Sequence, residues 1–309
     1  MKKLVLFVYI MVLAIGLSAC SGVDNAVDES SVDTTAEEMS QADMDISETK
    51  ETEIIEESET EKTIHFYRDN MKIFGRLYLP EGEGPFPVVI FVGGMSASYT
   101  YTQGYAKNLA ENGIAGVVFD CIGYCNPSPS DGALTDMSVL TAAKDVEVVI
   151  DEISSFLEID SENIFLWGHS LGGLITTYAA TQNSKDVQGL ICVEPSYQMR
   201  DQFEEMFPEG KEIPDVIYSP YVGKIFVEDI FSFDIYDKMP EYDGKVLLFQ
   251  GTVAPSIGAE APEYLERAAE TFPSVQVEAV EGADHGFSGD AGVQMLEKMI
   301  TFINDNMNE

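Results

Sequence analysis

Apolar and polar positions along the chain predict buried strands that alternate with amphipathic helices. The run FPVVIFVGG (86–94) is continuously apolar, which is typical of a parallel strand buried on both faces of a sheet. Apolar residues in 135–159 recur three and four positions apart, which places them on one face of a helix. A helix over 101–113 would end at Gly113, because glycine readily adopts the left-handed conformation of a helix end. The alternation continues with strands expected at 114–120, 163–168, 187–195, 245–251 and 275–282 and helices at 171–182, 262–272 and 292–305.

The fold class follows from this alternation. Segments 63–68 and 71–80 flank Asp69-Asn70, a favourable hairpin turn, so two antiparallel strands are expected to open the fold. The later strands alternate with helices, which requires a mostly parallel sheet with helices on both faces. We therefore predict an α/β fold with a mostly parallel eight-stranded sheet. The alternation breaks at about 195–243, and an insertion of this length between the sixth and seventh strands is typical of a lid or binding element.

Residues 1–20 have the pattern of a targeting segment. Lys2 and Lys3 precede an apolar run, 4–17, that is too short to span a bilayer comfortably. The run ends in Leu-Ser-Ala-Cys, which resembles the lipobox of bacterial lipoprotein signal peptides. This resemblance implies that Cys20 becomes the lipidated first residue of an extracytoplasmic protein, anchored to a bacterial cell membrane by its acyl chains. A plain signal peptide is the alternative.

Residues 21–62 are expected to be an acidic disordered linker. They contain 15 acidic residues against two lysines, and neither an aromatic residue nor a proline. Such a segment cannot bury enough apolar surface to offset the entropy lost on ordering. The globular domain is therefore expected to cover residues 63–309.

The net charge of −37 excludes one class of partner. No basic patch is present to neutralise phosphates, so we expect no nucleic acid partner. The sequence has no Cys-x-x-Cys pair and no cluster of histidines, so neither a metal nor a cofactor is expected. Beyond Cys20 the chain has Cys121, Cys125 and Cys192, which are expected to be free, partly buried thiols.

A serine motif lies between an expected strand and an expected helix, at Gly168-His169-Ser170-Leu171-Gly172, and it matches G-x-S-x-G. Strand, sharp turn and helix are the context of a nucleophile elbow, which exposes a serine hydroxyl above the sheet. Glycines flank the serine because the tight turn brings neighbouring backbones too close for side chains. Ser170 is therefore the candidate nucleophile, and a structural serine in a glycine-rich turn is the alternative.

With this motif in place, the chain resembles the α/β-hydrolase superfamily over residues 63–309. The superfamily orders its catalytic residues as nucleophile, acid and histidine, which assigns the general base to His285, in EGADHGF after the last strand. Its oxyanion hole implies two backbone N–H donors, those of Leu171 and Met95. The loop 93–96 departs from the superfamily pattern, because glycine replaces the usual histidine at its first position.

Several polar residues near these positions are expected to be structural. His65 lies in the first hairpin and is expected to be solvated, and His169 is expected to point elsewhere on the elbow. Asp284 is adjacent to His285, and neighbours along a backbone rarely reach each other's ring nitrogens well. Asp120 ends a strand at a place where members of the superfamily often have an aspartate.

The acid of the triad is missing from its usual place. Members of the superfamily often have Gly-Thr-x-Asp after this strand, whereas here Gly-Thr-Val (251–253) is followed by Ala254. Some members place the acid after the preceding strand, which implies Glu194 as the leading candidate. Glu260 or Glu263 farther along the chain, or a Ser–His dyad without an acid, remain open alternatives.

The resemblance implies a serine hydrolase that cleaves a carboxylic ester through an acyl-serine intermediate. The order of features looks most like bacterial carboxylesterases, including the feruloyl (cinnamoyl) esterases, so the expected substrate is a small-molecule ester. A serine aminopeptidase-like peptidase of the same fold and a catalytically degenerate binding lipoprotein are the alternatives. Aromatic residues of the insertion would suit an aryl or acyl group, with packing inside a lid as the alternative: Tyr197, Phe203, Phe207, Tyr218, Tyr221 and Phe226.

Overall fold

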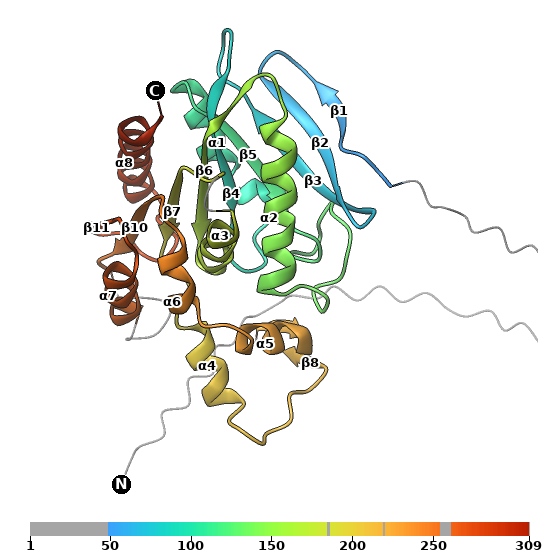
Figure 1. Cartoon of the computed structure of the whole chain (residues 1–309), viewed down its shortest axis with the longest axis vertical. Helices are drawn as coiled ribbons and strands as arrows, with labels where there is room; N and C mark the ends of the chain where they lie inside the picture. The colour runs from blue at the N-terminus through green and yellow to red at the C-terminus, as the bar shows by residue number, and fades with distance from the viewer. Residues whose placement is uncertain (1–48, 184–185, 219, 254–260, 309) are drawn as a thin grey trace, which may run out of the picture. The chain divides into compact units, whose positions relative to one another are not determined.

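A nine-stranded sheet organises the protein (Figure 1), whose computed structural model describes residues 49–183, 186–218, 220–253 and 261–308. Pairing is antiparallel up to the contact of β3 with β5 and parallel from there on. The predicted mostly parallel sheet is therefore confirmed. In spatial order the strands are β1 (Glu53–Glu57), β2 (Glu61–Arg68), β3 (Met71–Tyr78), β5 (Ala115–Asp120), β4 (Phe86–Val92), β6 (Ile159–His169), β7 (Gly189–Val193), β10 (Lys245–Gly251) and β11 (Val275–Val280).

The sheet has one strand more than the eight expected, and the extra strand corrects the expected domain boundary. Strand β1 lies inside residues 21–62, the segment expected to be a linker, and pairs antiparallel with β2 at the sheet edge. All five of its residues are exposed, so its sequence, EIIEE, carries no alternation of buried and exposed positions. Edge pairing through the backbone, rather than burial of side chains, holds this strand, and a hydrophobicity pattern cannot register that. The described domain therefore begins well before residue 63.

The predicted hairpin turn is confirmed by its backbone. Asp69 and Asn70 connect β2 to β3 with φ values of 51° and 63°. Positive φ at both central residues is the requirement of a type I′ turn, whose twist matches that of the flanking strands.

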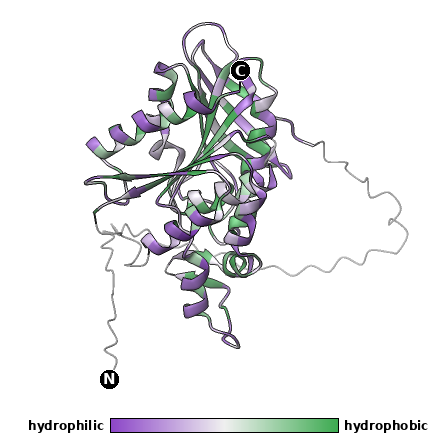
Figure 2. Ribbon diagram, turned by 60° about the vertical axis from the view of Figure 1, so that its left-hand side comes forward, coloured by the Kyte–Doolittle hydropathy of each residue, from purple (hydrophilic) through white to green (hydrophobic). Residues whose placement is uncertain are grey.

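Helices cover both faces of the sheet, as predicted, and each face has its own apolar core. In β4, Val88 and Ile90 face one core while Val89 and Phe91 face the other, because successive side chains of a strand point to opposite sides. Figure 2 shows the apolar residues concentrated along the strands and on the inner sides of the helices. The first core is covered by α2 (Val139–Ser154), α3 (Leu171–Gln182) and α7 (Ala261–Thr271), and the second by α1 (Gln103–Glu111) and α8 (Asp290–Asn306).

Helix α2 illustrates how local sequence sets these elements. Ser138 is its N-cap and accepts from the Thr141 N–H, while the Ser138 N–H donates to Thr141 Oγ1, so the start of the helix is capped reciprocally. The expected apolar stripe is buried from Val139 to Ile153. One charged residue, Asp145, lies in that stripe and is fully buried.

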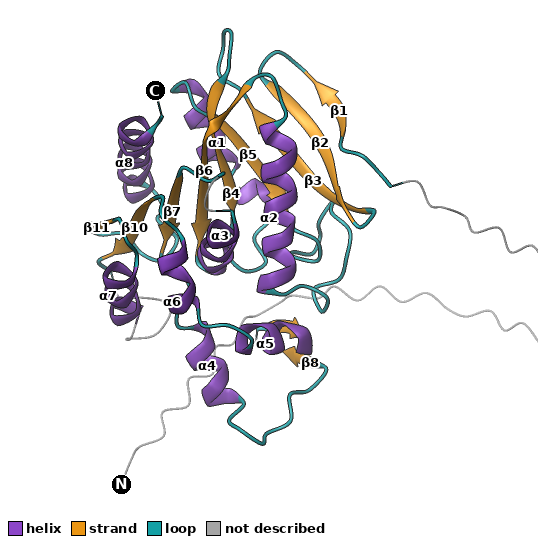
Figure 3. Ribbon diagram, in the orientation of Figure 1, coloured by secondary structure: helices purple, strands orange, loops and turns teal. Residues whose placement is uncertain are grey.

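The insertion between β7 and β10 starts at the carboxyl end of β7, so it lies beyond that edge of the sheet (Figure 3). Five of its aromatic residues are buried in the first core, whereas Tyr218 and Tyr221 are exposed. The buried ones are Tyr197, Phe203, Phe226, Tyr236 and Tyr242. The insertion is thus packed onto the domain by side chains of its own. It comprises α4 (Met199–Met206), the hairpin β8 (Val216–Tyr218) and β9 (Tyr221–Gly223), α5 (Lys224–Phe231), α6 (Ile235–Lys238) and the short 3-10 helix η2 (Met239–Glu241).

Among the described residues, no helix combines the length and apolar character that a membrane crossing requires. Cys20 and the rest of the expected targeting segment lie outside the described residues.

Candidate active site

Ser170 occupies the sharp turn between β6 and α3, as a nucleophile elbow requires. Its backbone has φ 54° and ψ −120°, a conformation that L-residues other than glycine rarely adopt. A Cβ on Gly168 would lie 2.4 Å from the Gly172 carbonyl oxygen, and a Cβ on Gly172 would lie 2.2 Å from the Val92 carbonyl oxygen. Both flanking glycines are therefore required by close backbone approach, which is the reason the motif predicts them.

The Ser170 hydroxyl faces a second serine that the sequence did not single out. Ser170 Oγ lies 3.3 Å from Ser196 Oγ, and the Ser196 N–H donates to the Ser170 carbonyl at 3.0 Å. Among the described residues, Ser196 Oγ is the hydrogen-bond partner of the Ser170 hydroxyl. The hydroxyl is therefore not hydrogen-bonded to an imidazole in this structure. A serine two positions after an acidic residue carries no recognisable motif, so only the fold identifies it.

His285, which follows β11, and Glu194, which follows β7, approach each other across the end of β10, the strand between them. His285 Nδ1 lies 3.9 Å from Glu194 Oε2. That nitrogen is buried and, among the described residues, has no hydrogen-bond partner. Glu194 is only 5% exposed, and its other oxygen accepts from the Gly251 N–H at 2.6 Å. A closure of about 1 Å would convert the contact into a hydrogen bond, and such catalytic contacts are often long before substrate binds.

The other candidates for the acid are not placed at this imidazole. Glu263 lies exposed on α7, and no contact among the described residues joins it to His285. Glu260 and Ala254 lie outside the described residues. Asp284 accepts from the Gly286 N–H at 3.1 Å and closes its own turn, a structural role like the one expected.

His169 contacts the backbone of His285. Its Nε2 lies 2.7 Å from the His285 carbonyl oxygen, and the centroids of the two rings are 4.7 Å apart. Burial lowers the pKa of His169 to about 4, although the hydrogen bond to the His285 carbonyl opposes that shift. His169 is therefore neutral near pH 7. His169 was expected to point elsewhere on the elbow, and the sequence did not indicate its contact with the His285 carbonyl.

Two backbone N–H groups near Ser170 are free to bind an anion. Neither the Leu171 N–H nor the Met95 N–H has an acceptor among the described residues. Leu171 is the first residue of α3, where unpaired N–H groups and the helix dipole favour negative charge. The loop carrying Met95 packs tightly on the elbow, because a Cβ on Gly94 would lie 3.3 Å from Ser170 Cβ.

Asp120 has a structural role, as expected. It is 1% exposed and accepts from the Tyr99 N–H at 2.5 Å and from Ser128 Oγ at 2.8 Å. Burial raises its pKa, while these hydrogen bonds act in the opposite direction. The carboxylate thereby ties together the loops that follow β4 and β5.

The three described cysteines are free and buried: Cys121, Cys125 and Cys192. Burial raises the pKa of the Cys192 thiol to about 11, so it is not a reactive thiolate near pH 7. The described residues contain no cluster of metal-ligating side chains.

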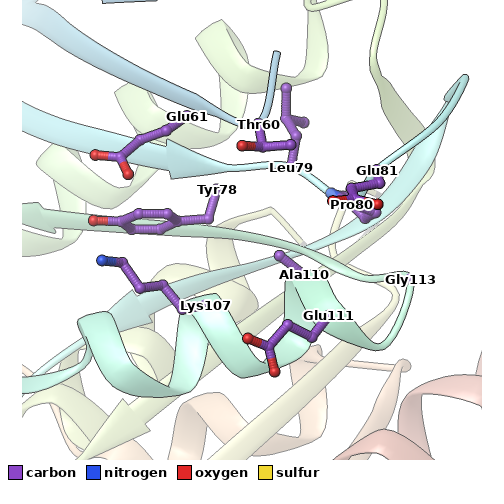
Figure 4. Close-up of a pocket in the computed structure, with 10 residues that line it drawn as sticks. All are labelled: Thr60, Glu61, Tyr78, Leu79, Pro80, Glu81, Lys107, Ala110, Glu111 and Gly113. Carbon is purple, nitrogen blue, oxygen red and sulfur yellow. The ribbon is translucent and has the colours of Figure 1, made fainter. Parts of the chain in front are cut away.

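A pocket of about 570 Å³ lies at the other edge of the sheet (Figure 4). Gly113, in its wall, leads into the amino end of β5, whereas Ser170 follows the carboxyl end of a strand in the same parallel set. Two of its charged groups have partners: Glu61 pairs with Arg76 at 2.5 Å, and Lys107 Nζ lies 5.3 Å from the centre of the Tyr78 ring. This pocket is therefore separate from the site around Ser170. It is lined by Thr60, Glu61, Tyr78, Leu79, Pro80, Glu81, Lys107, Ala110, Glu111 and Gly113.

Comparisons with known proteins show what this chain is similar to. A family model described as serine aminopeptidase, S33, matches residues 83–278. Esterase FrsA of Escherichia fergusonii is 26% identical over 147 residues, which cover 44% of this chain and 33% of the relative. FrsA of Escherichia coli O1:K1 / APEC gives the same identity and coverage. The match thus spans about a third of the length of these curated relatives.

Solved structures share the fold at low sequence identity. Est1E from Butyrivibrio proteoclasticus, solved with ferulic acid bound, has a TM-score of 0.69 and 18% identity, and the match covers 78% of this chain and 98% of that one. The α/β hydrolase GrgF from Penicillium sp. sh18 has a TM-score of 0.64 and 16% identity, with 80% and 99% covered. The α/β-hydrolase fold expected from the sequence is therefore confirmed.

Proposed function

Because the chain belongs to the family described as serine aminopeptidase, S33, and is an α/β hydrolase, we propose that it is a serine hydrolase that cleaves a carboxylic ester through an acyl-Ser170 intermediate. The observation that carries the proposal is the strained elbow at Ser170, flanked by the free N–H groups of Leu171 and Met95. A backbone held in a rarely populated conformation persists only where the surrounding structure enforces it, and such positions concentrate at active sites.

In the proposed first step, Ser170 Oγ attacks the carbonyl carbon of the ester while its proton passes to His285 Nε2. Because Nδ1 of this histidine faces Glu194, Nε2 is the nitrogen left to accept that proton. The Glu194 carboxylate would hold the ring in this orientation and stabilise the imidazolium that forms. Rotation of the hydroxyl away from Ser196 precedes attack.

The tetrahedral intermediate places its negative oxygen on the Met95 and Leu171 N–H groups. The ester C–O bond then breaks, and the leaving alcohol takes the proton from His285. Water, deprotonated by the same imidazole, releases the carboxylic acid and restores Ser170. Each step uses residues of this chain and water alone.

A fluorophosphonate probe tests the proposal directly. We expect covalent labelling of the wild-type protein at Ser170 and no labelling of the Ser170→Ala variant, because the probe reacts with an activated serine hydroxyl. A panel of p-nitrophenyl esters of increasing acyl length would then measure the acyl group the site accepts. A folded protein that is not labelled by the probe and hydrolyses none of the esters would contradict the proposal. It would instead support a binding lipoprotein without catalytic activity.

A peptidase is the second candidate, and the family description is the observation that favours it. Amide cleavage would use the same attack and oxyanion donors, but it requires protonation of a poorer leaving group. Aminoacyl p-nitroanilides and the matching p-nitrophenyl esters, assayed on one preparation, separate the two. We expect kcat/KM for the esters to exceed that for the anilides by more than a hundredfold; a smaller ratio would favour the peptidase.

The proposed substrate is a small, neutral ester with an aryl or acyl group. Esterase FrsA and the ferulic acid complex of Est1E support this class. The insertion between β7 and β10 would act as its lid, because it starts at the sheet edge where Ser170 lies. A surface of net charge −37 disfavours anionic substrates. Neutral and carboxylated aryl esters of equal size test this point, and the neutral one should have the lower KM.

We also propose that Cys20 carries a lipid and holds the domain at a bacterial membrane. The lipobox-like Leu-Ser-Ala-Cys supports this, and two or more acyl chains would suffice for stable attachment. Metabolic labelling with an alkyne fatty acid should mark the wild-type protein and spare the Cys20→Ala variant. Release of unlabelled wild-type protein to the medium would instead indicate a plain signal peptide.

A further inference from the structure

We propose that His169, beside the nucleophile, is a positioning residue that fastens the loop of the catalytic imidazole to the elbow. This inference rests on the proposed function of Ser170 and His285. Through His169 the chain directly before the nucleophile holds the backbone of the base, so the two catalytic groups would keep a common frame although they lie 115 positions apart in the sequence.

The contact that carries the inference is a short hydrogen bond. His169 Nε2 lies 2.7 Å from the carbonyl oxygen of His285, and the rings are inclined by 47° at a centroid separation of 4.7 Å. The bond reaches the backbone of the base and leaves its side-chain nitrogens available. His169 therefore fixes the backbone position from which the His285 side chain extends, and it does not compete for the protons of the His285 imidazole.

The protonation of His169 follows from its surroundings. The side chain is 7% exposed and packs against Trp167 and Tyr101 at centroid separations of 6.3 and 5.5 Å. Burial lowers its pKa to about 4, so near pH 7 it carries one ring proton. A carbonyl oxygen only accepts hydrogen bonds, so that proton lies on Nε2 and Nδ1 is left as an acceptor.

Tyr101 supports the same arrangement from the other side. Its hydroxyl lies 3.4 Å from His169 Nδ1 and 3.5 Å from the carbonyl oxygen of Gly286, the residue after the base. A hydroxyl that donates to His169 Nδ1 reinforces the Nε2–H form of the ring. Gly94 leaves the room this requires, because a Cβ there would lie 3.1 Å from His169 Nδ1.

Other contacts hold the base of the loop and leave its tip to His169. At one end the Val253 N–H donates to the Ala283 carbonyl at 3.0 Å, and at the other the Tyr105 hydroxyl donates to the Phe287 carbonyl at 3.4 Å. Between them the turn closes on itself through Asp284. Among the described residues, His169 is the residue outside the loop that makes a short hydrogen bond to His285.

Kinetics of two variants test this role. His169→Leu replaces the hydrogen-bond donor with an apolar side chain of similar size. We expect kcat to fall by roughly tenfold to a hundredfold, because a displacement of about 1 Å between catalytic groups has an effect of that size. KM should change by less than about threefold. His169→Gln, which can place an amide N–H near the position of Nε2, should recover most of the lost kcat. Equal losses in both variants would overturn the inference.

Two measurements on the protein itself keep the inference testable without catalysis. With ¹⁵N-labelled histidine, the three histidines of the chain should give resolvable signals, and His169 should be the neutral Nε2–H form at pH 7. Amide hydrogen exchange at 283–287 should accelerate at least tenfold in His169→Leu and stay close to wild type in His169→Gln. An Nδ1–H or charged His169, or unchanged exchange in His169→Leu, would sink the proposal.

The matched control is His65→Leu, which removes a histidine from β2, where its ring contacts Phe74 at 6.1 Å. It should leave kcat, probe labelling and exchange at 283–287 as in the wild type. A wild-type protein that shows the Nε2–H form and the exchange pattern but hydrolyses no ester would refute the proposed function and leave the fastening role of His169 intact.

Discussion

At the scale of single residues, backbone strain concentrates around the candidate nucleophile. Six described residues other than glycine have positive φ, and two of them, Asp69 and Asn70, form the hairpin turn. The other four surround the site: Ser96, Ser170, Glu194 and Phe287, with φ between 45° and 61°. Each such residue raises the free energy of the fold by about 1–3 kcal/mol, so their clustering indicates a geometry that the surrounding packing enforces.

Replacing Glu194 by glutamine tests the assignment of the acid. The amide keeps the size of the side chain but cannot stabilise an imidazolium, so kcat for a p-nitrophenyl ester should fall by roughly 10³- to 10⁴-fold. Circular dichroism should show an unchanged fold, since an amide oxygen can still accept from the Gly251 N–H.

Glu263→Gln and Glu260→Gln are the matched controls for this prediction, and both should retain activity within about twofold. If Glu194→Gln loses less than tenfold while one of the controls loses more, the acid is the other glutamate. If none of the three loses more than tenfold, a Ser–His dyad without an acid is supported.

The glycines of the elbow give a second prediction at this scale. Gly172→Ala should destabilise the protein by roughly 1–3 kcal/mol or more, because its Cβ would lie 2.2 Å from one backbone oxygen and 2.4 Å from another. Gly104→Ala in α1 is the contrast: nothing lies within 4 Å of its Cβ, so it should stabilise the fold by up to about 1 kcal/mol. Urea denaturation compares the two, and equal effects would contradict this account of the motif.

At the scale of elements, a buried carboxylate joins the end of β2 to α2 and to the loop after β5. Asp145 is fully buried, pairs with Arg68 Nε at 2.5 Å and accepts from the Ile122 N–H at 2.8 Å. Burial raises its pKa to about 6, while the Arg68 guanidinium and the Ile122 N–H limit the rise. The Asp145 carboxyl, which joins these elements, therefore titrates in a pH range where most carboxylates are already ionised.

The sign of the resulting pH dependence follows from proton affinity. The folded protein holds the Asp145 proton more tightly than the unfolded chain, so its contribution to stability is complete below about pH 4 and is lost as the pH rises to about 6. The loss is on the order of 3 kcal/mol. Urea denaturation at pH 4, 5, 6 and 7 should show the wild type losing stability relative to Asp145→Asn over this interval.

A constant difference between the two proteins would mean that Asp145 does not titrate there. A wild type that gains stability relative to the variant would mean that the Arg68 ion pair outweighs burial and depresses the pKa instead.

At the scale of the whole molecule, negative charges far outnumber positive ones. The chain has 54 acidic residues against 17 lysines and arginines, which gives the net charge of −37. Repulsion among these groups favours expanded states over the compact one, and salt screens it over about 30 Å at 10 mM and about 8 Å at 150 mM ionic strength.

The melting temperature should therefore rise with salt. Between 10 and 150 mM NaCl at pH 7 we expect an increase of several degrees, which corresponds to roughly 1–2 kcal/mol for a domain of this size. Sucrose at the same osmolarity carries no charge and should shift the midpoint much less. A midpoint that falls with NaCl would show that attractive ion pairs, such as Arg76 with Glu61, outweigh the repulsion.

The sequence by itself determined the fold class and the position of the elbow. Continuous apolar runs, the spacing in α2 and the glycines around Ser170 are local consequences of burial and close backbone approach, and such constraints can be read along one chain. The count of strands could not be read this way, because β1 is exposed at an edge and is held by backbone pairing with β2.

Only the tertiary structure decided what surrounds the serine. Glu194 and His285 lie 91 positions apart in the chain, and their approach depends on β7 and β11 lying on either side of β10 in the sheet. The pairing of β6 with β7 brings Ser196 to the Ser170 hydroxyl, and the strand order β6-β7-β10-β11 brings the His285 carbonyl to His169. Contacts of this kind arise from strand order, which no local pattern of hydrophobicity or turn residues specifies, and for that reason they became visible only in the folded chain.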